Sequence, residues 1–205
     1  MIIEGEQAMS GSTENKIILL VEDEAIIAAV QKKNLEHYGY KVINANTGER
    51  ALEIFKDNKA IDIILMDIDL GKGIDGPGTA VMMLKERDIP VVFLSSHTEP
   101  EIVDKTDRIT FYGYVAKDSG ITVLDASIKM AFRLFDANRK IVEIAARNQF
   151  LVEGLPGIVY SFSSMQGGVY YSPIVTNFLG YSQEQLYADP HLWQNSIHPD
   201  DIPRV

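Results

Sequence analysis

Acidic side chains follow two short hydrophobic runs of the chain, and a hydroxyl and a lysine follow two others. Glu22 and Asp23 come after the first run, and Asp67 ends another. Ser95 and Lys117 end two further runs. In an open parallel α/β sheet, ligands bind at the carboxyl ends of the strands. We therefore expect these five side chains to converge on one place.

These residue types suit a divalent cation and a phosphoryl group. Mg²⁺ prefers oxygen ligands, and clustered carboxylates repel one another unless a cation compensates them. A carboxylate such as that of Asp67 can also act as a nucleophile and form an aspartyl phosphate. The cation and Lys117 would then neutralise charge on the transferred group, and the hydroxyl of Ser95 could bond one of its oxygens.

Each position also has an ordinary explanation when it is taken singly. An acid at the end of a strand is often a solvated loop residue, and the pair Asp67 and Asp69 alone carries little information. Ser95 with Ser96 could simply cap the next helix. Only the combination, in this order and at successive strand ends, predicts a site.

The elements that must position these residues show the periodicity of repeated βα units from residue 16 to about 135. We expect strands at 16–21, 40–44, 61–66, 90–94 and 112–116, and helices at 25–38, 48–58, 77–87, 99–106 and from 120 onward. The mixed composition around Val42 indicates an edge strand, whereas the apolar runs at 61–66 and 91–94 indicate strands covered on both faces. Right-handed crossovers predict a doubly wound five-stranded parallel sheet.

Local signals mark three of the expected helix boundaries. Gly39 suits the left-handed conformation that ends a first helix. Thr47 can cap the second helix, where Glu49 suits the positive end of the helix dipole. Gly76 and Pro77 suit the start of the third helix.

No proline or glycine falls between Ile121 and Glu153, which predicts a helix of about 30 residues and about 45 Å. Two apolar stripes run along it. One contains Ile128, Ala131, Phe135, Val142 and Ala145, and the other contains Ala137, Ile141, Ile144, Asn148 and Leu151. We expect the surplus length to pair with a partner helix, with Asn138 as a polar position that sets the register. The alternative is a helix packed on the sheet, followed by a separate short helix.

Four segments together resemble the receiver domain of two-component response regulators. They read Ile-Leu-Leu-Val-Glu-Asp-Glu at 18–24, Leu-Met-Asp-Ile-Asp-Leu at 65–70, Val-Val-Phe-Leu-Ser-Ser at 91–96 and Gly-Tyr-Val-Ala-Lys at 113–117. The resemblance covers about residues 16–135 and implies a flavodoxin-like fold. It also implies a histidine kinase or phosphotransfer protein as the partner.

The resemblance implies a role for each residue of the motifs. Asp67 is the phosphoacceptor, and Mg²⁺ is bound by Glu22, Asp23, Asp67 and the backbone carbonyl of Asp69. The remaining roles are those of the switch hydroxyl (Ser95), the switch aromatic residue (Tyr114) and the invariant lysine (Lys117). Receiver domains usually place a proline after this lysine, whereas this chain has Asp118, so we expect a different loop there.

A second resemblance, to the first half of a PAS domain, begins at residue 155. It is carried by Leu155-Pro156-Gly157-Ile158-Val159-Tyr160, Tyr171-Ser172-Pro173, Leu179-Gly180-Tyr181-Ser182 and Trp193 with Ile197-His198-Pro199-Asp200-Asp201. We expect strands at 158–162 and 169–172 joined by a turn at Gly167-Gly168, and short helices around 174–179 and 182–187. Receiver, helix and PAS in this order resemble the front of a sensory histidine kinase, although the chain contains no kinase nucleotide-binding motif.

These patterns divide the chain into four parts. We expect a tail at 1–15, a receiver core at 16–120, a last receiver helix continuing as a linker at 121–152, and the N-terminal part of a PAS domain at 153–205. The net charge of −10 argues against nucleic acid as a partner. No apolar run approaches the roughly 20 residues that span a bilayer. The absence of cysteine excludes disulfides and thiolate metal sites and fits a cytoplasmic location.

The functional prediction is phosphorylation-dependent signal transduction by a regulatory phosphoacceptor domain that is not an enzyme. Phosphorylation of Asp67 would change the face formed by Ser95 and Tyr114, and with it the attached helix, the PAS segment and a possible homodimer through that helix. We expect Tyr114 to lie between the site and the helix from residue 120 and to act as the relay. One alternative is a haloacid-dehalogenase-like, Mg²⁺-dependent phosphohydrolase with Asp67 as nucleophile and Asp69 as general acid. Another is a PAS-centred small-molecule sensor with an inactive receiver.

Overall fold

The computed structural model describes residues 15–96, 112–163, 165, 167–189, 192 and 197–201. It divides into two compact units, one ending at Asn138 and the other beginning at Arg139. The first unit is built on a five-stranded sheet in the order β2-β1-β3-β4-β5, and all its strand pairs are parallel. Among the described residues, no helix is long and apolar enough to cross a membrane.

The elements of the first unit lie close to the predicted ranges. The strands are β1 (Ile17–Val21), β2 (Lys41–Ala45), β3 (Ile63–Asp67), β4 (Val91–Ser95) and β5 (Gly113–Ala116). The helices are α1 (Ala25–His37), α2 (Gly48–Asp57), α3 (Gly76–Glu86) and the first part of α5 (Ile121–Glu153), whose residues from Arg139 onward belong to the second unit. The prediction of an edge position for the second strand is confirmed. The tail up to residue 14 and the helix predicted at 99–106 lie outside the described residues.

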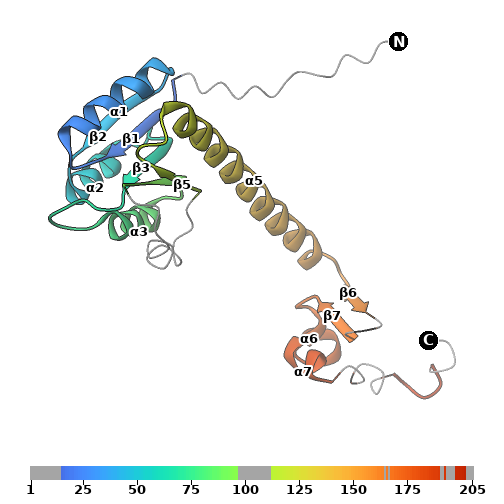
Figure 1. The fold of residues 1–205 in the computed structure, drawn as a ribbon. Coiled ribbons are helices and arrows are strands. Elements are labelled where there is room, and N and C mark those ends of the chain that lie inside the picture. The colour runs from blue at the N-terminus through green and yellow to red at the C-terminus, as the bar shows by residue number, and fades with distance from the viewer. Residues whose placement is uncertain are drawn as a thin grey trace, which may run out of the picture. The chain divides into compact units, whose positions relative to one another are not determined.

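Helices cover both faces of this sheet (Figure 1). On one face, Phe55 of α2 and Met83 of α3 pack with Phe93 and the neighbouring strand residues. On the other face, Leu35 of α1 and Ile128 of α5 pack with the alternate residues of the same strands. Because β1, β3 and β4 are buried on both faces, they read as continuous apolar runs. The predicted doubly wound α/β fold is therefore confirmed.

The helix boundaries follow the capping signals. Thr47 Oγ1 accepts a hydrogen bond of 3.1 Å from the backbone N–H of Arg50 at the start of α2. Gly39, with φ of 91°, adopts the left-handed conformation just after α1. Asp75 caps α3 by accepting a hydrogen bond of 2.8 Å from Gly78 N–H, so the Gly-Pro start has a carboxylate cap in front of it.

Helix α5 is one continuous helix of 33 residues (Figure 1), so the alternative of two separate helices is wrong. Its buried residues, Leu124, Asp125, Ile128 and Ala131, all lie in its first three turns. Asp125 accepts hydrogen bonds from Tyr40 Oη at 2.8 Å and from Lys129 Nζ at 2.7 Å. The start of α5 is thus part of the core of the first unit.

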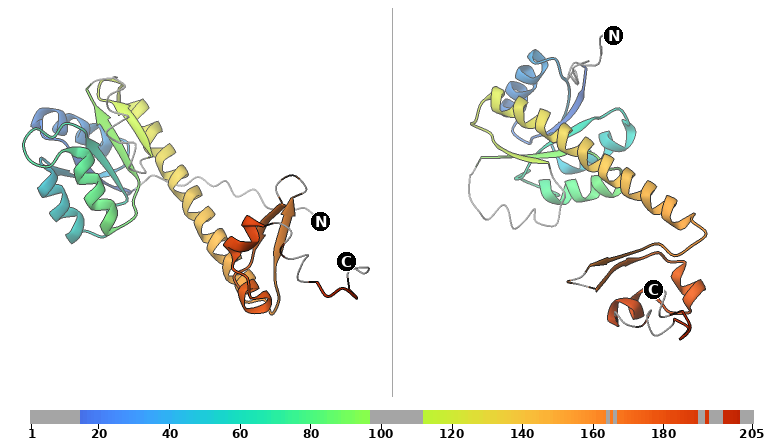
Figure 2. Two further views of the ribbon diagram at one scale, coloured as in Figure 1. Left: turned by 90° about the horizontal axis from the view of Figure 1, so that it is seen from below. Right: turned by 90° about the vertical axis from the view of Figure 1, so that its right-hand side faces the viewer.

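The second unit contains an antiparallel pair, β6 (Tyr160–Ser163) and β7 (Gly167–Tyr171), and two short helices, α6 (Val175–Leu179) and α7 (Gln183–Ala188) (Figure 2). The two strands and two helices were predicted. The prediction of a turn at Gly167-Gly168 was wrong, because both glycines lie in β7 and pair with Ser163 and Phe162. Three residues, Tyr171, Val175 and Leu186, form the buried cluster of this unit. Trp193 lies outside the described residues.

Candidate functional site

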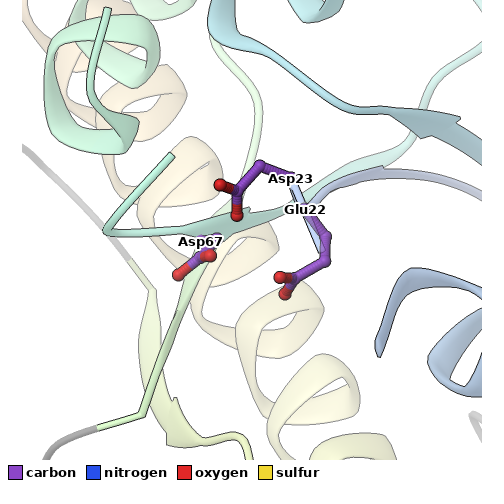
Figure 3. Close-up of side chains that lie close together, drawn as sticks. All are labelled: Glu22, Asp23 and Asp67. Carbon is purple, nitrogen blue, oxygen red and sulfur yellow. The ribbon is translucent and has the colours of Figure 1, made fainter. Parts of the chain in front are cut away.

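Three carboxylates meet at the carboxyl ends of β1 and β3 (Figure 3). Val21 is in register with Met66, so Glu22 and Asp67 occupy the same level at the edge of the sheet. Carboxylate oxygens of Glu22, Asp23 and Asp67 lie within 4.8 Å of one another. Glu22 is 1% and Asp67 is 3% exposed, whereas Asp23 is exposed. The convergence predicted for these residues is thus present in the structure.

Lys117, which directly follows β5, completes this cluster. Its Nζ donates hydrogen bonds to Asp67 Oδ2 at 2.7 Å and to Glu22 Oε1 at 2.9 Å. Nζ also lies 2.7 Å from Glu22 Oε2, a contact that lacks hydrogen-bond geometry. We name the four residues Glu22, Asp23, Asp67 and Lys117 the acidic pocket.

The charges of the acidic pocket do not balance. Three carboxylates and one ammonium carry a net charge of −2 when all are ionised. Burial raises the pKa of Glu22 and that of Asp67, although the hydrogen bonds from Lys117 lower both. Burial lowers the pKa of Lys117, but the neighbouring carboxylates outweigh it and leave that pKa above its ordinary value. The pocket therefore favours a further positive charge.

The ligand set of the pocket fits Mg²⁺. Glu22 Oε2 is buried and accepts no hydrogen bond within the described part of the chain. Its ionic contact with Lys117 is shared with Asp67, so the clustered carboxylates keep an excess of negative charge that a hard cation would offset. Asp23, which is exposed, offers an oxygen beside it.

Two glycines shape the pocket in a way that sequence analysis missed. A Cβ at Gly76 would overlap the carbonyl oxygen of Asp67, because the start of α3 lies directly against the end of β3. Gly76 N–H also donates a hydrogen bond of 3.2 Å to the carbonyl of Ile68. Gly71 has φ of 63°, and a Cβ there would lie 2.8 Å from Asp23 Oδ2. The Gly-Pro pair was the only sequence signal, and it indicated just a helix start.

The other predicted site residues surround the pocket. Asp69 is exposed, and its N–H donates a hydrogen bond of 3.3 Å to Asp67 Oδ1. Ser95 is buried at the end of β4, and its carbonyl accepts a hydrogen bond of 2.8 Å from Lys117 N–H. This bond ties the end of β4 to the backbone of the pocket lysine. Tyr114 lies on β5, opposite Phe93 in the register.

Packing corrects one expectation about Tyr114. Val115 packs with Leu124 and Ile128 of α5. Side chains alternate along a strand, so Tyr114 belongs to the opposite face of the sheet. A direct relay from Tyr114 to the helix that begins near residue 120 is therefore not what the structure shows. The short loop from Lys117 to Ile121 connects the pocket to α5 instead.

An apolar groove of about 410 Å³ adjoins the pocket. Its lining includes Ile26 and Val30 of α1, Ile121 of α5, and Val115 and Lys117. Ile26 is 82% and Val30 is 56% exposed. Lys117 thus contacts both the carboxylates and the groove.

Comparison with known proteins matches the first unit. The family model described as the response regulator receiver domain matches residues 18–129. The probable transcriptional regulator ycf27 of Porphyridium aerugineum is 33% identical over 124 residues, which are 58% of this chain and 49% of that protein. The chain therefore spans about half the length of the curated relatives that it matches.

Two solved structures support the same assignment. One is the N-terminal domain of a response regulator/sensory box/GGDEF three-domain protein from Carboxydothermus hydrogenoformans, with 46% identity and a TM-score of 0.57 over 60% of this chain and 98% of that one. The other is the signal receiver domain of a modulated diguanylate cyclase from Desulfovibrio desulfuricans G20. It has 31% identity and a TM-score of 0.56, and the match covers 61% of this chain and 99% of that one.

Proposed function

Because the chain belongs to the response regulator receiver family, we propose that Asp67 accepts a phosphoryl group and that its phosphorylation state is read through α5. Receiver domains are regulatory phosphoacceptor domains of two-component phosphorelays and are not enzymes. They interact with histidine kinases or phosphotransfer proteins. The response of the rest of the protein to this phosphorylation is also a proposal.

The proposed chemistry uses the acidic pocket. An oxygen of the Asp67 carboxylate attacks the phosphorus of a phosphohistidine, a P–O bond forms, and the P–N bond breaks with its electron pair going to the imidazole nitrogen. Glu22, Asp23, Asp67 and the backbone carbonyl of Asp69 would hold Mg²⁺, which supplies positive charge to the phosphoryl oxygens. Lys117, 2.7 Å from Asp67 Oδ2, supplies a second positive charge at the same place.

The observation that carries the proposal is the pairing of one largely buried lysine with two buried carboxylates, one that follows β1 and one that ends β3. A phosphorylated Asp67 would compete with Glu22 for the ammonium of Lys117. The family match does not favour a phosphohydrolase or an inactive receiver. The exposed side chain of Asp69 forms no part of the described carboxylate cluster, so nothing in the pocket supports it as a general acid.

We propose that the signal leaves the pocket along the backbone. Ser95 would bond a phosphoryl oxygen, and the bond between its carbonyl and Lys117 N–H couples β4 to the loop after β5. Only residues 118–120 separate Lys117 from α5. Tyr114 would respond on the other face of the sheet, as a second output surface. A ligand or modification shifts such a switch only by contacting its two states differently.

The phosphodonor would dock on the groove beside Lys117. Its histidine must reach an oxygen of Asp67, and this groove is an apolar surface adjoining the pocket. Exposed Ile26 and Val30 would then be covered by an apolar helix face of the donor. The net charge of −10 supports a protein rather than a nucleic acid as this partner.

The second unit is proposed to be the first part of a PAS domain. Its antiparallel β6–β7 pair followed by two short helices supports this resemblance. The matched Carboxydothermus protein joins a response regulator to a sensory box, which supports a sensory module after the receiver. A homodimer through α5 belongs to the same proposal.

Incubation with acetyl phosphate and MgCl₂, followed by intact mass spectrometry, tests the phosphoacceptor. A single phosphoryl adduct is expected, with none in Asp67→Asn. Asp69→Asn, a matched change of an exposed neighbouring carboxylate, should keep the adduct because only its backbone is assigned to the cation. An adduct that persists in Asp67→Asn, or rapid hydrolysis of phosphate esters that Asp69→Asn abolishes, would contradict the proposal.

A further inference from the structure

One face of α5 carries large apolar side chains that remain exposed. Val123, Met130, Leu134, Ile141, Ile144 and Leu151 are each between 46% and 64% exposed. From Met130 to Leu151 the spacing alternates four, three, four, three, four and three residues when Ala137 and Asn148 are included. We name this stripe of α5 the seam: Met130, Leu134, Ala137, Ile141, Ile144, Asn148 and Leu151.

The seam lies on a different face of α5 from the residues that contact the sheet. Leu124, Ile128 and Ala131 are buried against the first unit, and no α5 residue after Ala131 is buried. An isolated helix of about 20 residues is marginal in water, since its stability comes mostly from packing an apolar face. The 3–4 alternation of the seam is the pattern that packs against another helix in a left-handed coiled coil.

The polar seam residue indicates which helix covers it. In a parallel, in-register pair of identical helices, Asn148 faces Asn148, and the two amides can hydrogen-bond to each other. In an antiparallel pair it would face an apolar seam residue and leave a buried amide without a partner, which is costly. Asn138, the position predicted from sequence, lies just outside the seam beside Ala137, and its Nδ2 is 3.5 Å from Tyr112 Oη.

The charges beside the seam indicate the same orientation. Arg133, Lys140 and Arg147 flank the seam on one side, each directly before Leu134, Ile141 or Asn148. The other side carries the uncharged Asn138, Ala145 and Val152. In a parallel pair each basic side faces the uncharged side of the partner. In an antiparallel pair the two basic sides face each other, and like charges disfavour that arrangement.

We infer that α5 pairs through the seam with α5 of a second copy of this chain, as a parallel, in-register, two-stranded coiled coil. The inference deepens the homodimer proposed above by naming its contact residues and its orientation, and it does not depend on phosphate uptake at Asp67. Parallel pairing brings the residues that follow Glu153 in the two chains to the same end of the coil. A change at the start of α5 is then presented to both second units together.

Sedimentation equilibrium of two matched variants tests the contact residues. Ile144→Glu places a charge in the seam, whereas Val142→Glu places the same charge two residues away, at a position that is 68% exposed and outside the seam. Ile144→Glu should raise the dissociation constant of the dimer at least about tenfold, because buried central contacts carry most of the association energy. Val142→Glu should change it less than about twofold.

Three sedimentation outcomes would overturn the inference, and they differ in whether they also contradict the proposed homodimer. If both variants weaken the dimer equally, the seam is not the contact surface, although the chain still forms a homodimer. A wild-type chain that stays monomeric at tens of micromolar would contradict both the seam contact and the homodimer. The acetyl phosphate experiment would still test Asp67 as the phosphoacceptor. A three-chain mass would contradict the two-stranded arrangement.

Disulfide trapping tests the orientation of the two helices. Because the chain contains no cysteine, each variant has only the one thiol that was introduced. Ala137→Cys and Leu151→Cys occupy equivalent seam positions, two heptads apart. In the parallel pair each variant alone should form a disulfide-linked dimer, since equivalent residues face each other at the short distance a disulfide needs. Ala146→Cys, on the opposite side of α5, should not. Failure of both variants to form the disulfide-linked dimer on their own, while the chain is dimeric, would contradict the parallel, in-register pair and overturn the inference.

Discussion

Lys117 Nζ and Asp67 Oδ2 lie 2.7 Å apart, and the lysine side chain is only 9% exposed. The same ammonium contacts Glu22, so one largely buried cation is shared between carboxylates that follow β1 and end β3. Such a cluster is sensitive to any change of charge, because burial strengthens attraction and repulsion alike. Changes of charge at Asp67, Glu22 and Lys117 are therefore expected to alter the stability of the protein.

Asp67→Asn should stabilise the metal-free protein at pH 7 by about 1 kcal/mol. Burial raises the pKa of Asp67 above its ordinary value of 3.8, so the folded state binds a proton more tightly than the unfolded chain does. The ionised carboxylate therefore costs stability, and this cost grows as the pH rises from 3.8 through the raised pKa. Asparagine removes the charge while its carbonyl can still accept from Lys117. Urea unfolding in EDTA at pH 4 and pH 7 measures the difference, and a stabilisation that is larger at pH 4 would contradict it.

Mg²⁺ should raise the unfolding temperature of the wild-type protein by several degrees at concentrations well above its dissociation constant. Glu22→Gln should lose most of this increase, since it removes one of the three negative charges of the acidic pocket. Glu24→Gln is the matched control, because Glu24 is exposed and lies outside the carboxylate cluster. Thermal scans with and without MgCl₂ give the comparison. If both variants respond to Mg²⁺ as the wild type does, the assignment of Glu22 as a ligand is wrong.

Lys117→Met should destabilise the protein at pH 7 by about 3 kcal/mol, because two buried carboxylates lose their cation. Lowering the pH protonates these carboxylates, so the loss should shrink toward pH 4. Lys33→Met, at an exposed position of α1, should change the free energy of unfolding by less than about 0.5 kcal/mol. Chemical denaturation over this pH range measures both. A loss for Lys117→Met that does not depend on pH would show that the lysine acts through packing alone.

Gly76→Ala should destabilise the first unit by at least about 2 kcal/mol, since the new methyl group would overlap the carbonyl oxygen of Asp67. Gly113→Ala is a suitable control, because its Cβ would make an ordinary contact of 3.6 Å with Val92. Urea unfolding compares the two variants, and acetyl phosphate labelling shows whether moving the backbone of Asp67 also slows phosphorylation. Similar stabilities for the two variants would show that α3 can shift away without cost.

Val30→Asp should slow phosphoryl transfer from a protein donor by about tenfold, because it places a charge in the apolar groove beside Lys117. Labelling by acetyl phosphate should not change, since this small donor needs no docking surface. Ala29→Asp puts the same charge at an exposed neighbour that does not line the groove. Transfer from a phosphorylated histidine phosphotransfer domain, followed by mass spectrometry, gives the rates. Equal slowing with both donors would place the effect in the acidic pocket.

Much of the site was predictable because it depends on local patterns. Asp67 ends an apolar run long enough for one buried strand, and the connection rules bring the ends of such strands to one edge. Thr47 and Gly39 act within their own helices, and their roles were correct for the same reason. The role of Gly76 was missed, because the carbonyl it lies against belongs to a residue nine positions earlier, across a loop.

The order of residues along this chain was enough to determine the alternation of strands and helices, the edge position of β2 and the five side chains at the strand ends. These properties follow from backbone periodicity and hydrophobicity, which are written in neighbouring residues. Only the tertiary structure decided that Lys117 contacts Glu22 as well as Asp67, that Tyr114 faces away from α5, and that α5 is buried along Leu124, Ile128 and Ala131. Each of these depends on which face of an element is covered by segments distant in the sequence, and packing of the whole unit settles that choice.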